Sequence, residues 1–311
     1  MQRHITRRQA IGGVAAAAAW LGGCASTRSA ETALISRPIP ATGERLPVIG
    51  VGTNNFGVEA PAALAARRAV LAQLPQLGGS VVDTAPLYGR AEGVIGDLVA
   101  ALGNRSQLFL ATKVIAFSAA AGRDSMEQSL AKLRTARIDL MQVHNLIGVE
   151  AMLPVLQQWK RAGRIRYLGI TTSSAAQHPR MMAYMQRYPL DFIQVDYSLG
   201  NRVAAAQVLP LAQARGIAVI ANTPFGGRRA AAGVFARVAG RPLPGWAADI
   251  GVTTWSQFFL KYVVSHPAVT CTVPGTTEPA HLADNQHAGR GRLPDAAMRT
   301  RMEALWESLP G

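Results

Sequence analysis

The sequence is poor in cysteine and in lysine. Its 311 residues include only two cysteines, Cys24 and Cys271, so no disulfide framework holds the fold together. Only four of the 32 basic residues are lysines, and the arginines are scattered along the chain. There is no run of five like charges and no basic stripe interleaved with aromatic residues, so the net charge of +14 does not indicate a nucleic-acid site. An anionic lipid or an anionic ligand stays open as a partner.

A long apolar run is also missing, and the short one at the N-terminus indicates export. The paired arginines Arg7 and Arg8 precede a glycine- and alanine-rich stretch that is too short for a stable membrane span. This arrangement resembles a twin-arginine signal, which directs folded proteins to the bacterial periplasm. We therefore expect residues 1–23 to be an export signal. Removing its three arginines lowers the net charge from +14 to +11.

The expected signal ends in a motif that bears on membrane attachment. Residues 21–24 (Leu-Gly-Gly-Cys) resemble a lipobox, in which case Cys24 is lipidated after cleavage. The alternative is ordinary cleavage near Ser29 and Ala30, which discards Cys24. In both cases we expect a periplasmic protein, and a lipid on Cys24 would anchor it to a membrane. Residues 24–44 are expected to form a polar tether ahead of a single domain, residues 45–311.

The rest of the chain has a globular composition, with 49% apolar and 16% charged residues. From residue 46 onward, apolar strand-like segments alternate with helical patterns, one of which begins near Asp124 with a capping box. This alternation forces parallel pairing, and eight such units predict a closed (β/α)8 TIM barrel. An open doubly wound sheet is the rival, but the glycines after the first strand do not fit G-x-G-x-x-G. The expected strands are 46–53, 81–84, 108–113, 138–143, 165–170, 192–196, 217–221 and 269–273.

Ionisable residues stand at the ends of three neighbouring strands. Asp83, Lys113 and His144 close the second, third and fourth strands, and Tyr88 follows the second. Taken alone, Asp83 is typical of a turn and His144 of a structural histidine. In a barrel, however, the strand ends meet around one rim, where the active sites of this fold lie. A lysine that closes an apolar strand is costly unless it is paired. We therefore expect these four residues to form one site.

The order of several motifs resembles the aldo-keto reductase superfamily, over roughly residues 46–310. The matching segments are 82–89 with Asp83 and Tyr88, 111–114 with Lys113, 142–144 with His144, then 163–170, 194–199, 273–276 and 284–285. The resemblance implies a (β/α)8 barrel that uses a nicotinamide cofactor to transfer hydride to an aldehyde or ketone.

The resemblance also implies a role for each residue of this set. Tyr88 would be the general acid that protonates the carbonyl oxygen. A tyrosine releases its proton more readily beside an ammonium group, which Lys113 would supply while Asp83 holds it in place. His144 would donate a hydrogen bond to the carbonyl oxygen and help to fix the substrate.

A cofactor site and a substrate pocket follow from the same resemblance. The expected cofactor is NADPH, with NADH as the alternative, and no metal is expected. The cofactor-binding residues would be Thr171, Thr172, Gln194, Asn222, Pro224, Phe225, Gly226, Arg228, Gly275, Thr276, His281, Asp284 and Asn285. The pocket wall would consist of Phe56, Leu87, Phe117, Asn145 and the loop 225–246, with Phe56, Leu87 and Asn145 binding the substrate.

The expected cofactor site departs from the family pattern at several positions. Thr172 stands where the family usually has an asparagine, and Asn222 where an aromatic residue often stacks on the nicotinamide. Gly275 and His281 occupy places where many NADP-preferring members carry lysine and arginine. The neighbouring pair Arg228 and Arg229 either supplies the missing positive charge or is ordinary surface charge.

These observations favour an exported NAD(P)H-dependent carbonyl reductase that acts on a small carbonyl compound. A rival hypothesis is a catalytically weak periplasmic barrel lipoprotein that binds a ligand or a partner protein. A third is that the signal is inefficient and the protein works in the cytoplasm. Nucleotide-dependent turnover of a simple aldehyde separates the first two. The sequence indicates neither the physiological substrate nor the oligomeric state.

Overall fold

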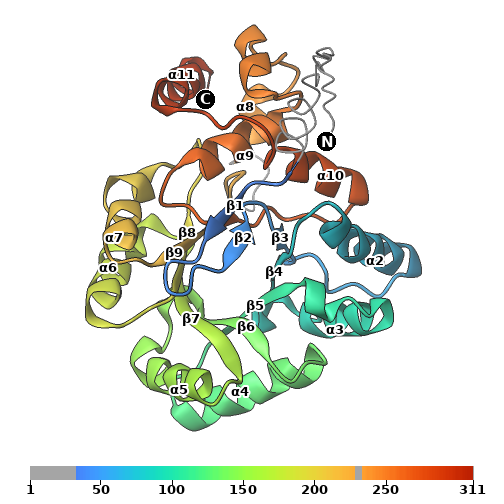
Figure 1. Cartoon of the computed structure of the whole chain (residues 1–311), viewed down its shortest axis with the longest axis vertical. Helices are drawn as coiled ribbons and strands as arrows, with labels where there is room; N and C mark the ends of the chain where they lie inside the picture. The colour runs from blue at the N-terminus through green and yellow to red at the C-terminus, as the bar shows by residue number, and fades with distance from the viewer. Residues whose placement is uncertain (1–32, 228–232, 311) are drawn as a thin grey trace, which may run out of the picture.

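The computed structural model describes residues 33–227 and 233–310, which form a (β/α)8 barrel. Eight parallel strands are hydrogen-bonded in the order β3 to β10, and bridges from Ile49 to Thr272 and from Gly52 to Gly275 close the sheet. The predicted TIM barrel is thus confirmed, with its helices arranged around the outside (Figure 1). The strands are β3 (Val51–Gly52), β4 (Val81–Asp83), β5 (Phe109–Val114), β6 (Ile138–Val143), β7 (Ile165–Thr171), β8 (Phe192–Asp196), β9 (Ala218–Asn222) and β10 (Cys271–Thr272).

The helices connect the strands and cover the barrel. They are α2 (Pro61–Gln76), α3 (Ala91–Leu102), α4 (Ala119–Lys132), α5 (Val149–Arg161), α6 (His178–Arg187), α7 (Val208–Ala214), α8 (Val234–Val238), α9 (Trp255–Ser265), α10 (Pro279–His287) and α11 (Ala296–Ser308). The expected start of a helix near Asp124 is wrong. Helix α4 begins five residues earlier, where the Ser118 side chain accepts a hydrogen bond from the Ala121 amide and caps it.

The strands are apolar because both of their faces are buried. Every residue of β5 and β6 is buried, as is typical of parallel strands covered by helices. One core fills the barrel and includes Phe109, Tyr167 and Phe192, while a larger one lies between sheet and helices. Closure depends on Gly52, where a Cβ atom would lie 2.7 Å from the Val273 carbonyl oxygen.

A hairpin plugs the end of the barrel where the strands begin, here called the base. Strands β1 (Ser36–Pro38) and β2 (Arg45–Pro47) pair antiparallel and cross the middle of the barrel in Figure 1. Ile39 and Leu46 of this segment are 0% and 2% exposed within the barrel core. The expected tether is therefore wrong for residues 36–44, because these apolar side chains bury themselves in the base; residues 24–32 lie outside the described residues. The expected first strand, 46–53, is split between β2 and β3.

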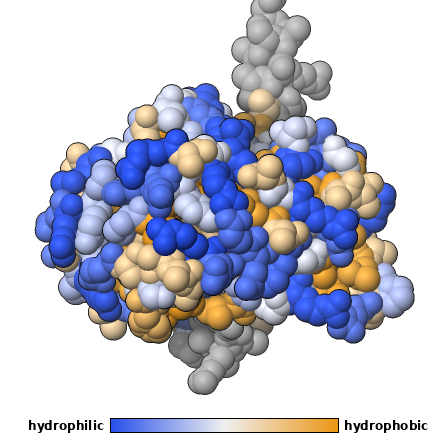
Figure 2. Space-filling view, turned by 90° about the horizontal axis from the view of Figure 1, so that it is seen from below, coloured by the Kyte–Doolittle hydropathy of each residue, from blue (hydrophilic) through white to orange (hydrophobic). Residues whose placement is uncertain are grey.

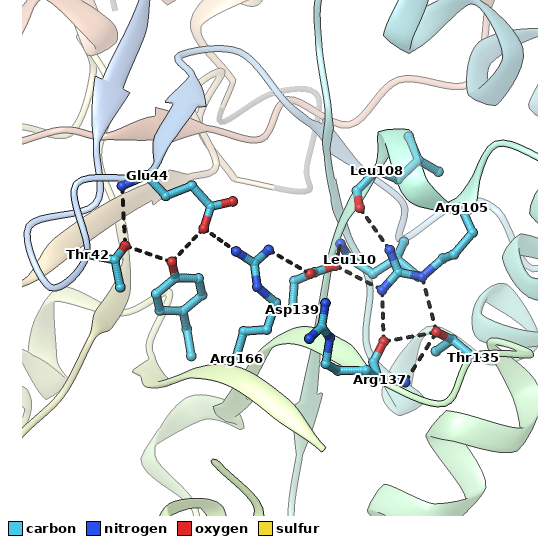
Figure 3. Close-up of polar contacts among 10 residues, drawn as sticks. Thr42, Glu44, Arg105, Leu108, Leu110, Thr135, Arg137, Asp139 and Arg166 are labelled. Carbon is cyan, nitrogen blue, oxygen red and sulfur yellow. Dashed lines mark hydrogen bonds and ion pairs between the residues drawn. The ribbon is translucent and has the colours of Figure 1, made fainter. Parts of the chain in front are cut away.

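A network of ion pairs surrounds the hairpin at the base (Figure 3). Glu44 accepts a hydrogen bond from the Tyr167 hydroxyl at 2.5 Å and forms an ion pair with Arg166. Arg166 and Arg105 each reach the Asp139 carboxylate at 2.9 Å. This basal network ties the hairpin to β6 and β7.

The surface of the barrel is largely polar. On the face seen in Figure 2, hydrophilic residues predominate and apolar residues reach the surface in smaller patches between them. None of the helices in the described part of the chain combines the length and the apolarity needed to cross a bilayer.

Candidate active site

A buried ion pair lies where β4 and β5 end, at the opposite end of the barrel from the base, here called the rim. The Lys113 ammonium donates to the Asp83 carboxylate and to the Thr84 carbonyl oxygen, both at 2.8 Å. The side chains of Lys113 and Asp83 are only 2% and 4% exposed. Burial lowers the pKa of Lys113, but the charge of Asp83, together with Tyr88, outweighs burial and leaves that pKa above its ordinary value. Lys113 is therefore held as a cation.

Tyr88 lies over this ion pair at the mouth of the barrel. It ends a single 3-10 turn, Pro86–Tyr88, that follows β4 and is followed by Gly89 at a φ of 64°. The Lys113 ammonium is 5.2 Å from the centre of the Tyr88 ring. The His144 ring stands edge-on to the same ring, with the two centres 6.1 Å apart. Tyr88 is thus flanked by a cation and an imidazole.

His144 is positioned by a constrained turn after β6. Asn145 and Leu146, the next two residues, have φ values of 53° and 56°, in the left-handed region that non-glycine residues rarely adopt. The Asn145 amide donates to the Thr171 hydroxyl at 3.1 Å, which fixes the turn to β7. Such constrained turns cluster at functional sites, where they hold a side chain in place. His144 itself is 7% exposed.

These four residues open into a cavity of about 590 Å³ at the rim. Asp83, Tyr88, Lys113 and His144 all line it, so the structure brings the expected catalytic set together. Leu87 and Asn145, expected to bind substrate, also line it. So do the expected cofactor residues Thr171, Gln194, Asn222, Pro224, Phe225, Gly226 and Gly275.

One wall of the cavity offers polar groups suited to an amide. Gln194 is 1% exposed, and its side-chain oxygen has no hydrogen-bond partner among the described residues. Asn222 donates to the Thr172 carbonyl oxygen at 3.0 Å and is thereby fixed at the end of β9. A ligand amide could donate to the Gln194 oxygen and satisfy it, and a buried acceptor of this kind is costly without a partner. The residues therefore fit the carboxamide of a nicotinamide ring.

Several expected binding residues do not line the cavity. Phe56 is 0% exposed and packs in the core under the Arg67 guanidinium, so its expected contact with substrate is wrong. Phe117 is 84% exposed and is not part of the cavity wall. The Thr172 hydroxyl is occupied by the Gln177 side chain at 2.6 Å. The Phe56 ring and the Thr172 hydroxyl thus make contacts within the fold and are not available to a ligand in the cavity.

The expected residues near α10 stabilise the loop after β10. Asn285 donates to the buried Thr276 hydroxyl at 2.9 Å, and the Asp284 carboxylate accepts from Thr254 and Gln257 at the start of α9. They lie outside the cavity wall, as does the exposed His281. Arg228 and Arg229, like Cys24, lie outside the described residues.

The cavity also contains residues that the sequence did not single out. They are Gly52, Thr53, Asn54, Ser173, Thr223 and Val273. All follow or end a strand, so their position next to strand ends was the available signal. Thr223 has a φ of 46°, a second constrained turn at the rim that no sequence pattern indicated.

Comparison with known proteins gives consistent matches. A family model described as Aldo/keto reductase family matches residues 48–307. The chain is 32% identical to the aldo-keto reductase YhdN of Bacillus subtilis over 52% of its own length, and it spans only about half (51%) of that relative. It is 28% identical to the methylglyoxal reductase YeaE of Escherichia coli, over 77% of this chain and 84% of that one. A solved aldo/keto reductase from Klebsiella pneumoniae, in complex with NADP and acetate, superposes with a TM-score of 0.68 at 25% identity, covering 85% and 93% of the two chains.

Proposed function

The chain belongs to the aldo/keto reductase family, and on this premise we propose that it is an exported NADPH-dependent oxidoreductase that reduces an aldehyde or ketone to an alcohol. The observation that carries the proposal is the Asp83–Lys113 ion pair beneath Tyr88 and His144, at the floor of one cavity. The cofactor is a nicotinamide nucleotide, as in the relative from Klebsiella pneumoniae.

The residues of this chain divide the work of the reaction among them. The bound nicotinamide supplies the hydride that reduces the carbonyl carbon. Tyr88 transfers its hydroxyl proton to the carbonyl oxygen, so that the product leaves as a neutral alcohol and water restores the proton. Lys113 stabilises the negative charge that remains on Tyr88, and Asp83 keeps Lys113 charged and aimed. His144 stabilises the carbonyl oxygen as charge develops on it. Thr171, Gln194 and Asn222, which line the cavity, would hold the carboxamide of the cofactor.

A tyrosine substitution tests this proposal. Tyr88→Phe removes only the transferable proton, so carbonyl reduction should fall by at least ~10²-fold while nucleotide binding survives. The measurements are steady-state reduction of a simple aldehyde and titration of NADPH by fluorescence. Tyr188→Phe is the control, because Tyr188 lies at the end of α6 and away from the cavity. Near wild-type turnover by Tyr88→Phe would rule out its role as the acid.

The preference for NADPH rests on the segment after β9. Gly226 and Gly227 allow close approach, and Arg228 and Arg229 follow them. We assign the 2′-phosphate to this pair, and each lost charge-assisted contact should weaken NADPH binding by ~1.5–3 kcal/mol. The Arg228→Ala/Arg229→Ala variant should therefore lose NADPH affinity while NADH affinity stays constant. An unchanged ratio of the two affinities contradicts the assignment.

The proposed location of the protein is the periplasmic face of a membrane, which it would reach through a twin-arginine signal. Arg7-Arg8 and the Leu-Gly-Gly-Cys motif support cleavage before Cys24 and lipidation of that residue. Mass spectrometry of membrane fractions should find an acylated peptide that begins at Cys24, and Cys24→Ala should abolish it. A soluble cytoplasmic form that still begins at Met1, without the acylated peptide, would overturn this proposed location.

A second function is supported by one structural observation and one general consideration. Asn222 is fixed by its bond to Thr172 where an aromatic residue often stacks on the nicotinamide, and reduced nucleotides are scarce outside the cytoplasm. Both favour a binding lipoprotein that has kept the barrel and lost turnover. Failure to reduce any simple aldehyde with either nucleotide, in a protein that still binds ligands, would favour this second function.

A further inference from the structure

The turns at the base of the barrel are rich in positive charge. The basal face is defined here as residues 36–47, 77–80, 103–108, 133–137, 161–164, 187–191, 214–217, 265–270 and 288–295. It contains eleven arginines and only three carboxylates, those of Glu44, Asp191 and Asp295. The segments that follow the strands at the rim, without the long one after β9, contain two arginines and two carboxylates. They are Arg90, Arg202, Glu59 and Glu278. The positive charge is therefore concentrated at one end.

Five of the basal arginines are exposed and form no ion pair with a carboxylate within the part of the chain that the structure describes. They are Arg45, Arg137, Arg161, Arg187 and Arg215. They lie on the hairpin and on four successive turns that precede β6, β7, β8 and β9, so they are distributed around the base. Arg137 is visible beside the basal network in Figure 3, where its backbone amide and carbonyl form hydrogen bonds and its guanidinium forms none of those drawn. Arg45 donates to Ser36 of the hairpin and Arg187 lies over the Tyr188 ring, but neither interaction neutralises the arginine charge.

The chain also enters the barrel at this end. The Ile35 amide donates to the Gly289 carbonyl oxygen at 2.8 Å, and the Ile35 carbonyl accepts from the Val48 amide. Leu34 lies against Gly78 and Gly289, which follow the ends of α2 and α10. Leu34 follows Cys24 by ten positions, so an acyl group on Cys24 would lie within ~35 Å of this face.

We propose that the basal face docks on a membrane surface rich in anionic phospholipid, with the catalytic cavity opening away from it. A basic surface is attracted to an anionic membrane, and each arginine near that membrane contributes about 1 kcal/mol. Among the described residues, the exposed large apolar side chains are Leu87, Phe117, Val203 and Phe235, and all lie in segments after strand ends. The contact is therefore electrostatic and involves no insertion. The proposed lipid on Cys24 supports this orientation, but the charge of the face does not depend on it.

An anionic membrane fits this face better than a nucleic acid does. The five arginines come from separate turns around the whole base and do not form a groove interleaved with exposed aromatic rings, which single-stranded nucleic acids require for stacking. Each arginine near an anionic membrane strengthens binding by about 5-fold, so several together give substantial attraction that salt weakens.

Vesicle binding by the unlipidated full chain tests the proposal. The chain carries Cys24→Ser in every sample, so the outcome is independent of lipidation and of carbonyl reduction. Binding to phosphatidylcholine vesicles is measured with and without added phosphatidylglycerol, at low and high salt. The Arg137→Gln/Arg187→Gln/Arg215→Gln variant should lose about 100-fold of its binding to the anionic vesicles. Aldehyde reduction should be unchanged, because these residues lie away from the cavity.

A matched control separates the basal face from net charge. Arg68, Arg123 and Arg241 are exposed and lie outside the basal face, and changing all three to glutamine removes the same charge. This control variant should bind anionic vesicles within about 3-fold of the parent. Equal loss by both variants means that only net charge matters and overturns the proposal. Binding of a single-stranded RNA in place of vesicles, lost in the basal variant, also overturns it.

Fluorescence quenching measures the orientation of the barrel on the membrane. A fluorophore is attached to Ala136→Cys at the base or to Phe117→Cys at the rim, both exposed positions, and vesicles carry a headgroup quencher. Cys271 is 0% exposed, and burial raises the pKa of its thiol, so it stays unlabelled. Quenching at Ala136→Cys but not at Phe117→Cys supports the proposed orientation. Equal or reversed quenching contradicts it.

Discussion

Asp83 and Asp139 are both nearly buried in the barrel wall, at 3% and 4% exposure, yet they are used differently. At the base, Asp139 uses both oxygens, accepting from Arg105, from Arg166 and from the Leu110 amide. At the rim, Asp83 uses one oxygen for Lys113 and leaves the other without a hydrogen-bond partner among the described residues. The two aspartates thus differ in how fully their oxygens are paired.

The same contrast extends to neighbouring residues. At the base, Asp191 binds Lys160 through both oxygens and also accepts from the Leu168 amide. Toward the rim, the Gln142 amide is 0% exposed with neither polar atom paired within the described chain, and the Gln194 oxygen is likewise unpaired. Unpaired buried groups cost stability, whereas groups that are already paired cannot bind a ligand. Toward the rim, then, Asp83, Gln142 and Gln194 keep polar atoms that are not used within the described part of the fold, whereas Asp139 and Asp191 at the base use both of their oxygens to stabilise it.

Breaking the basal network should have the largest effect on stability. Asp139→Asn removes the charge shared by Arg105 and Arg166 and should lower the free energy of unfolding by about 3 kcal/mol. This is the low end for a buried pair, because the arginine side chains are 29% and 30% exposed. Urea denaturation measures the loss. Asp97→Asn, which breaks an ion pair with both side chains more than 60% exposed, is the control and should change little.

Low pH should destabilise the fold through His266, which lies at the basal end of the barrel. Burial, with help from Arg299 and Arg37, lowers the pKa of His266 to about 4. A histidine whose pKa falls on folding destabilises the fold as the pH drops below its unfolded value near ~6.5. Between pH 6.5 and 4 the cost grows to at most about 3 kcal/mol. In urea titrations at neutral and acidic pH, His266→Asn should remove this part of the loss. An unchanged pH dependence in the variant would contradict the assignment.

The smallest predicted effect has opposite signs at two buried glutamines. Gln142→Leu replaces an unpaired amide near the rim and should raise the free energy of unfolding by about 1 kcal/mol. Gln257→Leu should lower it by about 2 kcal/mol, because that amide binds both Thr253 and Asp284. Gln142 and Gln257 are 0% and 4% exposed, so the two substitutions bury a similar apolar area. Destabilisation by both would mean that the Gln142 amide is as well satisfied as the paired Gln257 amide, and its assignment as an unpaired buried group would fail.

The barrel was predictable because parallel strands buried on both faces read as apolar runs. β6 and β8 begin and end where the sequence placed them, and Asp83, Lys113 and His144 stand out because they interrupt such runs at their ends. Strand ends of a barrel share one rim, so placing these residues together needed no further information.

The remainder depends on contacts between distant segments. The polar sequence around residues 36–47 gave no sign that Ile39 would enter the barrel, since one apolar residue in a loop has no periodicity. Phe56 follows the first strand as a pocket residue would, but its ring is needed in the core beneath Arg67. Asn145 and Thr223 also adopt left-handed turns, and the turn at Asn145 is fixed by the Thr171 hydroxyl of β7, a contact between segments that lie far apart in the sequence.

The closing seam of the barrel has a consequence for the time course of folding. The first barrel strand pairs on one side with β4, but on the other side the Gly50 amide bonds to the Thr272 carbonyl oxygen, which is synthesised about 220 residues later. At ~5–20 residues per second, a ribosome needs roughly 10–45 s to synthesise that interval. During this time an N-terminal signal is already outside the ribosome, while the cylinder still has two open edges. Export by the proposed twin-arginine route, which carries folded proteins, would therefore wait for the last strand. A nascent chain truncated before Thr272 would retain exposed strand edges prone to aggregation.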